Sequence, residues 1–418
     1  MHSSVLLPLA ALVAAASLRA QSVEERLRTL ERDNRSLRAQ VEALSSDVEL
    51  LDLGGLVPPL GQAGRGVGQG AAKVYDIEQG FSLGGYGEFL FQPRQGRTDV
   101  ADAQRSILYV GYKFDERWVF NTEIEFEHGS TSTGGSVSIE FGYLDYLHSE
   151  ALNLRGGLLL SPLGLVNELH EPTMFLPASR PQTESRIIPT TWPAMGAGAY
   201  GDVGDFSYRA YLMTSLDGAN FSSSGLRGGR QKGSRSEAED WSFVSKVDYV
   251  GSPGLTVGGS VSYGDTGQDR LDDSLPTANA VPAMRTTILE AHIDYRTGPW
   301  QVRALFAQAR VADAGAFNAS TGGNLATRMR GYYGEFGCDV LHWLAPGSRE
   351  QLTPFVRFER IDTQDRMPTG FVADASQDDE ILTVGVNYKP LSQVVIKFDY
   401  ERWDNDFDRF NVLFGYVF

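Results

Sequence analysis

The sequence predicts an all-β protein, a transmembrane antiparallel β-barrel of about 16 strands that follows an N-terminal coiled-coil helix. Three observations predict this class. Apolar and polar residues alternate with a period of two in segments that recur along residues 81–418. Short turns and long loops alternate as the connections between these segments. A heptad pattern of apolar residues fills residues 22–51.

The composition excludes several other classes of protein. The 418 residues contain 37 Lys and Arg against 53 Asp and Glu, which gives a formal net charge of −16. So acidic a chain lacks the clustered bases that neutralise phosphates, and no nucleic-acid partner is expected. The single cysteine, Cys338, excludes an intrachain disulfide, and no apolar run is long enough for a membrane-spanning helix. The mean hydropathy of −0.23 resembles that of a soluble protein, but a barrel averages a lipid-facing surface against a wet one.

Residues 1–20, MHSSVLLPLAALVAAASLRA, are expected to be a signal peptide. The apolar run from Val5 to Ala16 has the length of a secretory core and is too short to cross a bilayer. The alternative is the start of a buried helix. A signal peptide predicts export, and with a barrel it predicts the outer membrane of a Gram-negative-type bacterium.

Residues 22–51 are predicted to form a coiled-coil helix in the periplasm. Apolar residues follow a narrow 4-3 spacing, and the other positions are mostly charged or small. The alternative, a charged helix lying on a domain surface, would show a wider apolar face. A buried Asn in the seam favours two strands by the heptad rules. The residues assigned to oligomerisation are Leu27, Leu30, Asn34, Leu37, Val41, Leu44 and Val48.

The barrel is expected at residues 81–418, after a Gly- and Pro-rich linker at 52–80 without periodicity. In RWVFNTEIEFEH, residues 117–128, apolar and aromatic side chains alternate with polar and acidic ones. The same pattern recurs down the chain. The expected strands are 81–92, 104–114, 116–128, 136–148, 152–161, 195–203, 205–216, 239–250, 253–264, 284–296, 299–311, 327–341, 351–361, 379–389, 392–403 and 408–418.

Two features favour a membrane barrel over a soluble sandwich. Aromatic residues end the apolar faces, as in the series Val137, Ile139, Phe141 and Tyr143, and such residues form girdles at the two membrane interfaces. Tight turns also alternate with long polar loops, as they do in outer-membrane barrels. A barrel of about 16 strands leaves an aqueous channel, whereas a barrel of about eight is filled by its own side chains.

The chain ends in RFNVLFGYVF, with alternating aromatic residues that include Tyr416 and Phe418. This ending resembles the signal by which the barrel assembly machinery recognises outer-membrane barrels. With its leader, coiled coil, linker and barrel, the whole chain resembles an outer-membrane porin of the phosphate-selective porin O/P-like group. The resemblance implies a homotrimer in contact with outer-membrane lipid and lipopolysaccharide. A trimer conflicts with the two-strand preference read at Asn34, and we give the barrel precedence because heptad preferences are tendencies.

If the aromatic faces meet lipid, the opposite faces line a pore. Carboxylates outnumber bases there, and carboxylate rings favour cations, so a mild cation preference is expected and the family's phosphate is not carried over. The alternative is that these carboxylates only keep the lumen wet. The assignment depends on register, because a slip of one residue exchanges the faces. The residues assigned to the pore lining are Glu123, Glu125, Glu127, Glu140, Arg209, Glu290, Asp294, Arg303, Asp399 and Glu401.

The longest segment without alternation, residues 162–194, is expected to fold into the barrel and narrow the channel. Loops of this length are usually functional or disordered, and its prolines and apolar residues favour order. The alternative is an external loop packed on a neighbouring subunit. Charges of both signs in a constriction would orient a polar solute by their transverse field. The residues assigned to this constriction are Glu168, Glu171, Arg180, Glu184 and Arg186.

No enzyme, cofactor or metal site is expected. Glu168, His170 and Glu171 invite a zinc site but lack the spacing of its ligands, and no nucleophile motif accompanies the dispersed histidines. The predicted function is a water-filled channel for passive diffusion of small hydrophilic solutes or ions. The alternative is a structural protein whose coiled coil tethers the barrel to the cell wall or to a periplasmic partner.

Overall fold

The computed structural model describes residues 26, 28–32, 34–38, 40–41, 60, 62–94, 96–132, 134–270 and 281–418. The chain divides into two compact units, Met1–Gly55 and Leu56–Phe418. The expected signal peptide, the seam residues Leu27, Leu44 and Val48, and most of the first half of the expected linker lie outside the described residues. Across the described ranges, no helix is both long enough and apolar enough to cross a membrane.

In the first unit, the described residues between Arg26 and Val41 are helical and exposed. The seam residues Leu30, Leu37 and Val41 expose 59–65% of their surface. Arg38 Nε donates a hydrogen bond to Asn34 Oδ1 at 3.0 Å, one helical turn away. Assembly of this helix into a coiled coil stays a prediction.

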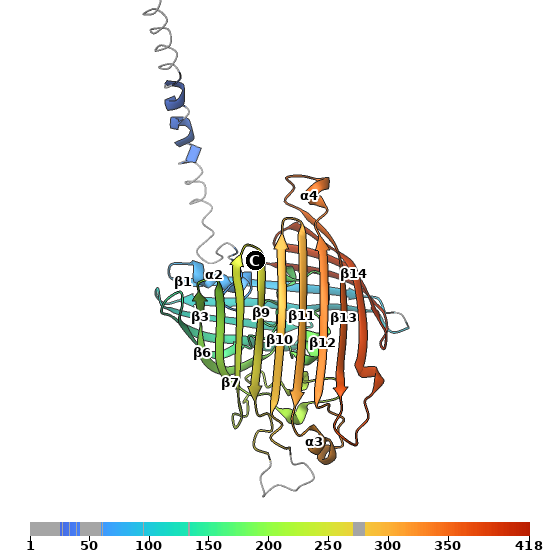
Figure 1. Ribbon diagram of the computed structural model, residues 1–418. Coiled ribbons are helices and arrows are strands. Elements are labelled where there is room, and N and C mark those ends of the chain that lie inside the picture. Colours follow the sequence, from blue (N-terminus) through green and yellow to red (C-terminus); the bar gives the residue numbers. More distant parts are fainter. Residues whose placement is uncertain are drawn as a thin grey trace, which may run out of the picture. The chain divides into compact units, whose positions relative to one another are not determined.

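The second unit is a closed barrel in which each strand pairs antiparallel with its neighbours in sequence and β1 pairs with β16 (Figure 1). All the expected strands are present, so the predicted class and strand number are confirmed. The strands are β1 Gly80–Gln92, β2 Val100–Lys113, β3 Trp118–Glu127, β4 Ser136–Leu147, β5 Asn153–Leu160, β6 Pro193–Val203, β7 Phe206–Thr214, β8 Trp241–Ser252, β9 Leu255–Gly264, β10 Thr286–Thr297, β11 Trp300–Val311, β12 Arg328–Cys338, β13 Gln351–Arg366, β14 Asp378–Leu391, β15 Val394–Trp403 and β16 Arg409–Val417.

Some strand bounds differ from expectation. β2 begins at Val100 and β13 continues to Arg366, both further toward the long loops than their alternation indicated. β12 ends at Cys338 because Asp339 Oδ1 accepts the backbone N–H groups of Leu341 and Leu352 and so starts a turn. That turn contains the short helix α4, Leu341–Leu344.

The connections alternate in length, as the sequence predicts, and they give the barrel two different ends. The turn end carries the short connections, such as residues 204–205 and 298–299, together with α4. The loop end carries the long ones, which contain the helix α3, Ala314–Thr321 (Figure 1). The other short helical segments are η1 Pro172–Met174, η2 Thr183–Ile187, η3 Gly218–Asn220, η4 Arg227–Gly229 and η6 Ala375–Gln377.

Apolar side chains cover the outside of the wall, and this agrees with the predicted lipid-facing pattern. They alternate along each strand with buried residues that face inward. Exposed examples from around the ring are Phe89, Leu108, Trp118, Phe126, Leu144, Leu212, Phe243, Val257, Leu289, Phe306, Tyr332, Phe358, Leu382, Phe398 and Phe414. An apolar belt that faces lipid rather than water is the surface a barrel needs in order to sit in a bilayer.

The face assigned to one half of β4 was wrong. Val137 and Ile139 point outward as expected, but Phe141 and Tyr143 are buried inside the barrel. The register of β4 against β3 shifts between the Glu123–Phe141 pair and the Ile124–Ile139 pair, so Glu140 is an extra residue in a bulge. A bulge exchanges the two faces of the strand beyond it. A period-two pattern cannot reveal it when both faces offer aromatic residues.

Helix α2, Gln69–Asp76, lies in the range where a linker was expected and packs inside the barrel on β1, β2 and β3. It belongs to the same compact unit as the strands. A Cβ on Gly111 of β2 would lie 2.6 Å from Val74 Cβ, so only glycine allows the helix this close. Asn121 Nδ2 donates to the Ala71 carbonyl at 2.9 Å, and Lys73 Nζ donates to the Leu83 carbonyl at 3.0 Å.

Candidate channel constriction

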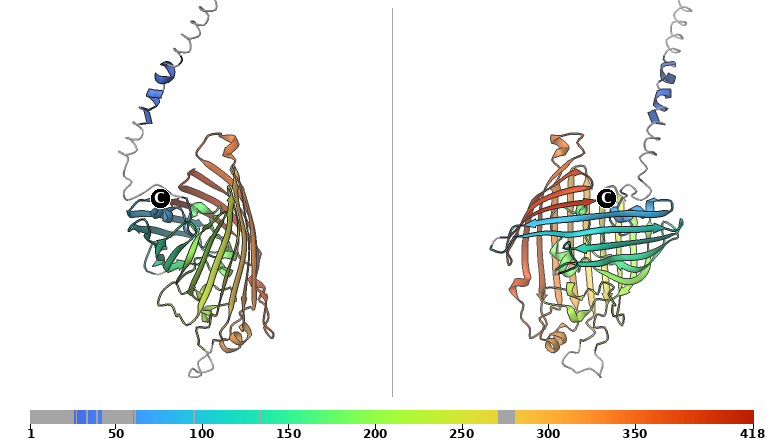
Figure 2. Two further views of the ribbon diagram at one scale, coloured as in Figure 1. Left: turned by 60° about the vertical axis from the view of Figure 1, so that its left-hand side comes forward. Right: turned by 180° about the vertical axis from the view of Figure 1, so that it is seen from behind.

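The loop that joins β5 to β6, residues 161–192, folds into the barrel and crosses its interior. We call it the inward loop. Its segment η1 contacts β1, β15 and β16, whereas η2 contacts β11, β12 and β13. Leu163, Ile187 and Trp192 are fully buried. In Figure 2 the loop is the green segment enclosed by the ring of strands. The expected inward fold of this segment is therefore observed.

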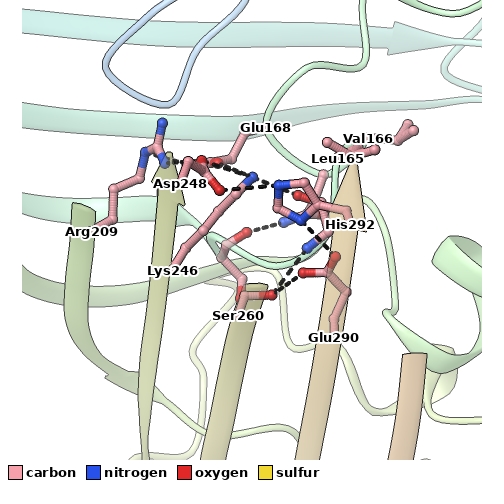
Figure 3. Close-up of polar contacts among 12 residues, drawn as sticks. Leu165, Val166, Glu168, Arg209, Lys246, Asp248, Ser260, Glu290 and His292 are labelled. Atoms are coloured by element: carbon pink, nitrogen blue, oxygen red, sulfur yellow. Dashed lines mark hydrogen bonds and ion pairs between the residues drawn. The ribbon is translucent and has the colours of Figure 1, made fainter. Parts of the chain in front are cut away.

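A charged network on β7–β10 holds the first part of the inward loop (Figure 3). Glu168 of the loop lies 3.0 Å from Arg209 Nε and 3.4 Å from Lys246 Nζ. Lys246 Nζ also donates to the Gly164 carbonyl at 2.7 Å. Each charge therefore meets an opposite charge or a hydrogen-bond partner, as buried ions require.

The same network continues along the wall to His292. Its Nδ1 lies 2.7 Å from Glu290 Oε1 and its Nε2 lies 3.1 Å from Asp248 Oδ1. Ser260 Oγ donates to Glu290 Oε2 at 2.5 Å. His292 therefore lies between two carboxylates and forms a hydrogen bond with Glu290 through Nδ1.

A second anchor holds the middle of the loop on β15. Lys397 Nζ donates to the carbonyls of Phe175 at 2.9 Å and Pro177 at 2.8 Å. Asp399 Oδ2 accepts the backbone N–H of Ala178 at 2.6 Å. Both side chains are almost fully buried, so they supply the hydrogen bonds that this non-helical backbone would otherwise lose.

A third anchor surrounds η2. Glu359 of β13 accepts the backbone N–H groups of Gln182 and Thr183 at 3.0 and 2.5 Å. Glu184 accepts those of Leu165 and Val166 at 2.8 and 2.7 Å, and the Tyr333 hydroxyl donates to its other oxygen. Burial raises the pKa of Glu184, and these donors act against that rise.

A fourth anchor joins the loop to β3 and α2. His170 Nε2 lies 3.2 Å from Glu123 Oε1, and His170 Nδ1 lies 3.0 Å from the Asn167 carbonyl. Burial, aided by the charge of Arg180, lowers the pKa of His170 to about 4. Glu171 accepts the backbone N–H groups of Gln69 at 3.0 Å and Gly70 at 2.8 Å at the start of α2.

All ten residues predicted to line the pore lie on the inward face of the wall, but most of them hold neighbouring groups. Besides Glu123, Arg209, Glu290 and Asp399, Asp294 binds Arg303, which donates to the Met174 carbonyl of the loop at 3.2 Å. Glu401 accepts from Trp403 Nε1 at 3.2 Å. Glu125 lies 3.6 Å from Arg105 and Glu140 lies 3.7 Å from Lys232, while Glu127 accepts from Ser136 Oγ at 2.9 Å.

The five residues predicted for the constriction have different positions and partners. Glu168, Glu171 and Glu184 bind the wall, α2 and the loop's own backbone, as described above. They therefore do not converge as a metal site would require. Arg186 donates to the Ser224 carbonyl at 2.9 Å and to Gln377 Oε1 at 2.7 Å. Arg180 alone among them lines an internal cavity.

That cavity, of about 190 Å³, lies between the inward loop and the wall formed by β1 and β2. Its wall side contains Glu88 and Arg105, whose charged groups lie 3.2 Å apart. Its loop side contains Arg180, whose Nη1 donates to Thr191 Oγ1 at 3.0 Å. Arg227, from the loop between β7 and β8, also lines it.

Charges of opposite sign face each other across this space. Loop residues Arg180, Arg227 and Arg230 form a basic side, and burial with the neighbouring guanidinium groups of Arg230 and Arg180 lowers the pKa of Arg227 to about 9. The wall residues Glu140, Glu127 and Glu125 interact electrostatically with Arg230. These charges set up an electric field across the cavity.

Sequence reasoning missed Arg227 and Arg230. They are brought inward because Leu226 N–H donates to the Arg186 carbonyl at 2.9 Å, which ties their loop to the inward loop. Gly225 has φ +127°, and a Cβ there would lie 2.3 Å from that carbonyl. The motif GLRGGR, residues 225–230, was the available signal, because glycines beside arginines permit such a close approach.

The chain has a close relative in sequence. No known protein-family profile matches it. A protein of Aquifex aeolicus, described as an uncharacterized protein, is 35% identical over 356 residues, which are 81% of this chain and 79% of that protein. The chain belongs to the family of this Aquifex protein.

Solved structures similar to the chain are outer-membrane proteins. OmpF of Salmonella typhi, in complex with daunomycin, has a TM-score of 0.53 at 12% identity and covers 81% of this chain and 98% of its own. The outer-membrane channel DcaP of Acinetobacter baumannii has a TM-score of 0.52 at 12% sequence identity, and the match covers 81% of this chain and 97% of DcaP. The trimer form of OmpT, an outer-membrane protein of Vibrio cholerae, has a TM-score of 0.52 at 9% sequence identity, and the match covers 82% of this chain and 100% of OmpT. These structural similarities show that the present chain, a member of the Aquifex protein's family, has the fold of outer-membrane β-barrels.

Proposed function

We propose that the protein is an outer-membrane porin, a water-filled channel for passive diffusion of small hydrophilic solutes or ions. The observation that carries this proposal is the charged cavity between the inward loop and the wall of β1 and β2. An inward loop that is anchored at four places, and still leaves a polar space, is suited to select solutes by size and charge. The fold and the outward apolar belt support a location in the outer membrane.

We propose a mild anion preference, opposite in sign to the one expected from the sequence. Most inward carboxylates that motivated a cation preference are bonded to the inward loop or to neighbouring side chains. The charged residues that line the cavity itself are Glu88 against Arg105, Arg180 and Arg227. Guanidinium groups that line a channel attract anions. We also propose that the protein is related to the phosphate-selective porin O/P-like group. The sequence layout of leader, coiled coil, linker and barrel, which resembles that group, supports this proposal.

We further propose a homotrimer assembled through the barrel and the N-terminal helix. The helix exposes Leu30, Leu37 and Val41, a seam that one chain alone leaves in water. The structural likeness to a trimeric outer-membrane protein supports the same number. The mass of the detergent-solubilised particle tests it. A trimer that persists in full-length protein and weakens after deletion of residues 22–51 supports the helix's role, and a monomer in both contradicts it.

A second role follows from the separation of residues 1–55 into their own unit. We propose that this N-terminal helix tethers the barrel to the cell wall or to a periplasmic partner. At the other end of the chain, we propose that Tyr416 and Phe418, at the β1–β16 seam, are recognised by the barrel assembly machinery. Deleting residues 22–51 tests the tether through envelope integrity. Unchanged integrity with normal barrel insertion contradicts it.

Conductance of purified protein in a planar bilayer tests the channel. We expect stepwise current increments as single particles insert. In a salt gradient, a reversal potential of anion-selective sign supports the proposed preference. Absence of increments from folded protein contradicts the channel, and a cation-selective sign contradicts the preference alone.

A further inference from the structure

We propose that the outward face of strands β11–β13, at the loop end of the barrel, binds the phosphorylated headgroup of an outer-leaflet glycolipid. The inference rests on the proposed function for one point only, namely that the barrel spans the outer membrane with its long loops outside. It concerns the outer surface and is independent of the pore.

Outward-facing arginines gather on this face. Arg310 of β11, Arg328 and Arg330 of β12 and Arg360 of β13 alternate with buried neighbours and so face outward near the loop end, and one more, Arg402 of β15, lies two strands away. In strands β3–β9, by contrast, the bases are Arg155, Arg209 and Lys246, and all three are buried inside the barrel. The proposed contact therefore involves one sector of the wall.

A groove of about 330 Å³ lies in this sector, where the apolar belt meets the charged rim. Phe306 and Tyr332 form its apolar part, and Arg330, Arg360, Asp362 and Asp365 form its charged part. The register places Tyr332 opposite both Phe306 and Arg360, so a guanidinium lies beside the last outward rings of the belt. A molecule with acyl chains and a charged head has both of these parts in the same order.

The arginines can exchange their present partners for a phosphate. Arg330 Nη1 lies 3.5 Å from Asp365, and Arg360 lies 3.0 Å from Asp378 and 3.6 Å from Glu380. The Arg330 and Arg360 side chains are 43–44% exposed, and exposed pairs of this kind contribute little stability. Arg310 makes no ion pair with any residue that the structure describes.

Guanidinium groups match phosphate well because their planar fork donates two parallel hydrogen bonds. The rings beneath them favour a lipid phosphate over free phosphate, since Phe306, Tyr332 and Phe358 are exposed apolar surface that acyl chains would cover. The carboxylates in the groove limit the site to a ligand that also offers donors, such as the hydroxyl groups of a sugar headgroup. These two features together select a phosphorylated glycolipid.

Native mass spectrometry of the full-length protein in detergent tests the site, with bisphosphorylated lipid A and dephosphorylated lipid A as probes. We expect wild type to retain the phosphorylated probe at least about tenfold better than the dephosphorylated one. The double variant Arg330→Gln/Arg360→Gln should lose about tenfold in affinity for the phosphorylated probe. Arg349→Gln is the matched control, because Arg349 is an exposed arginine beside β13 at the opposite, turn end.

Several outcomes overturn the proposal: equal binding of the two probes, equal binding by the double variant, an equal loss in R349Q, or displacement of the lipid by millimolar inorganic phosphate. Gel mobility before and after heating checks that each variant is folded, and R330Q alone is used if the double variant is not. The channel is scored separately. Wild type that conducts but retains no lipid A contradicts this site, whereas retention without currents contradicts the channel.

Discussion

The carboxylate of Glu171 accepts the backbone N–H of Gly70 at 2.8 Å, and this contact joins the inward loop to helix α2. A second oxygen of the same carboxylate accepts the N–H of Gln69. Two unpaired N–H groups at a helix start are thereby satisfied by a charge of favourable sign. Helix α2 and the inward loop therefore support each other within the barrel.

Replacing Glu171 with Gln should loosen α2. The amide offers one acceptor oxygen in place of two, and a buried N–H is left without a partner at a cost of about 1–3 kcal/mol. Hydrogen exchange of residues 69–76 should accelerate at least about fivefold, which is the rate change that 1 kcal/mol gives. E150Q, in an exposed turn, is the control. Unchanged protection of α2 in E171Q would contradict the latch.

Acid should weaken the anchor made by His170. Its folded pKa of about 4 lies below the ordinary 6.5, because burial and the Arg180 charge disfavour the protonated ring. As pH falls from about 6.5 to about 4, the unfolded loop takes up a proton that the folded loop does not, so loop stability falls by about 3 kcal/mol. Exchange protection of residues 167–176, corrected for the intrinsic rate, measures this.

The comparison that isolates His170 is wild type against H170Q. Glu171 acts in the opposite direction, since burial raises its pKa to about 7 and loop stability then rises as pH falls. Glu123 and Glu125 of β3, Arg105 of β2 and Arg180 also face this histidine. All of them remain in H170Q, so the difference in the pH dependence of loop stability between the two proteins reports the effect of His170 alone. A stability advantage of wild type that fails to shrink as pH falls would refute the assignment.

Lys397→Met should free the middle of the inward loop. The change removes the donor to two buried carbonyls, those of Phe175 and Pro177, at a cost of about 2–4 kcal/mol. Exchange of residues 172–182 should accelerate at least about tenfold. Lys113→Met is the matched control, because Lys113 Nζ likewise donates to two carbonyls, those of Tyr75 and Ile77, but outside the inward loop. Equal effects of both variants on residues 172–182 would count against a local anchor.

Arg180→Gln should shift ion selectivity toward cations. It removes one of three guanidinium groups from the cavity while Glu88 remains. The reversal potential in a tenfold salt gradient should move by several millivolts in the cation-selective direction. R349Q, at the turn end and outside the barrel, should leave it unchanged. No shift in R180Q, with normal conductance, would place the ion path elsewhere.

The barrel could be predicted from the sequence because its strands obey a rule of period two. Residues that face the apolar core of the bilayer must be apolar. The chain end after β16 helps to close the ring, because Phe418 N–H donates to the Gly85 carbonyl at 2.9 Å. The bulge at Glu140 could not be predicted by that rule. The extra residue turns Phe141 and Tyr143 to the inside of the barrel, but their aromatic side chains also fit the outward pattern. Helix α2 escaped because its eight residues are too few to show a helical period.

The inward loop could be located from the sequence but its charges could not be assigned. Glu168, Glu171 and Glu184 look the same in sequence as a pore-lining carboxylate would. Their partners come from β8, α2 and β12, segments far away in the chain, so only the closed barrel reveals that they serve as anchors. Arg180, by contrast, lines the cavity that remains.

Chemical modification at Arg180 tests the central claim that solutes pass between the inward loop and the β1–β2 wall. Arg180→Cys in a Cys338→Ser background carries one thiol, since Cys338 is the chain's sole cysteine. The account predicts stepwise single-channel currents that fall sharply when a charged methanethiosulfonate reagent is added. Arg349→Cys in the same background should be unaffected. Currents that are absent, or that persist unchanged after the introduced thiol is shown by mass to have reacted, would contradict the account.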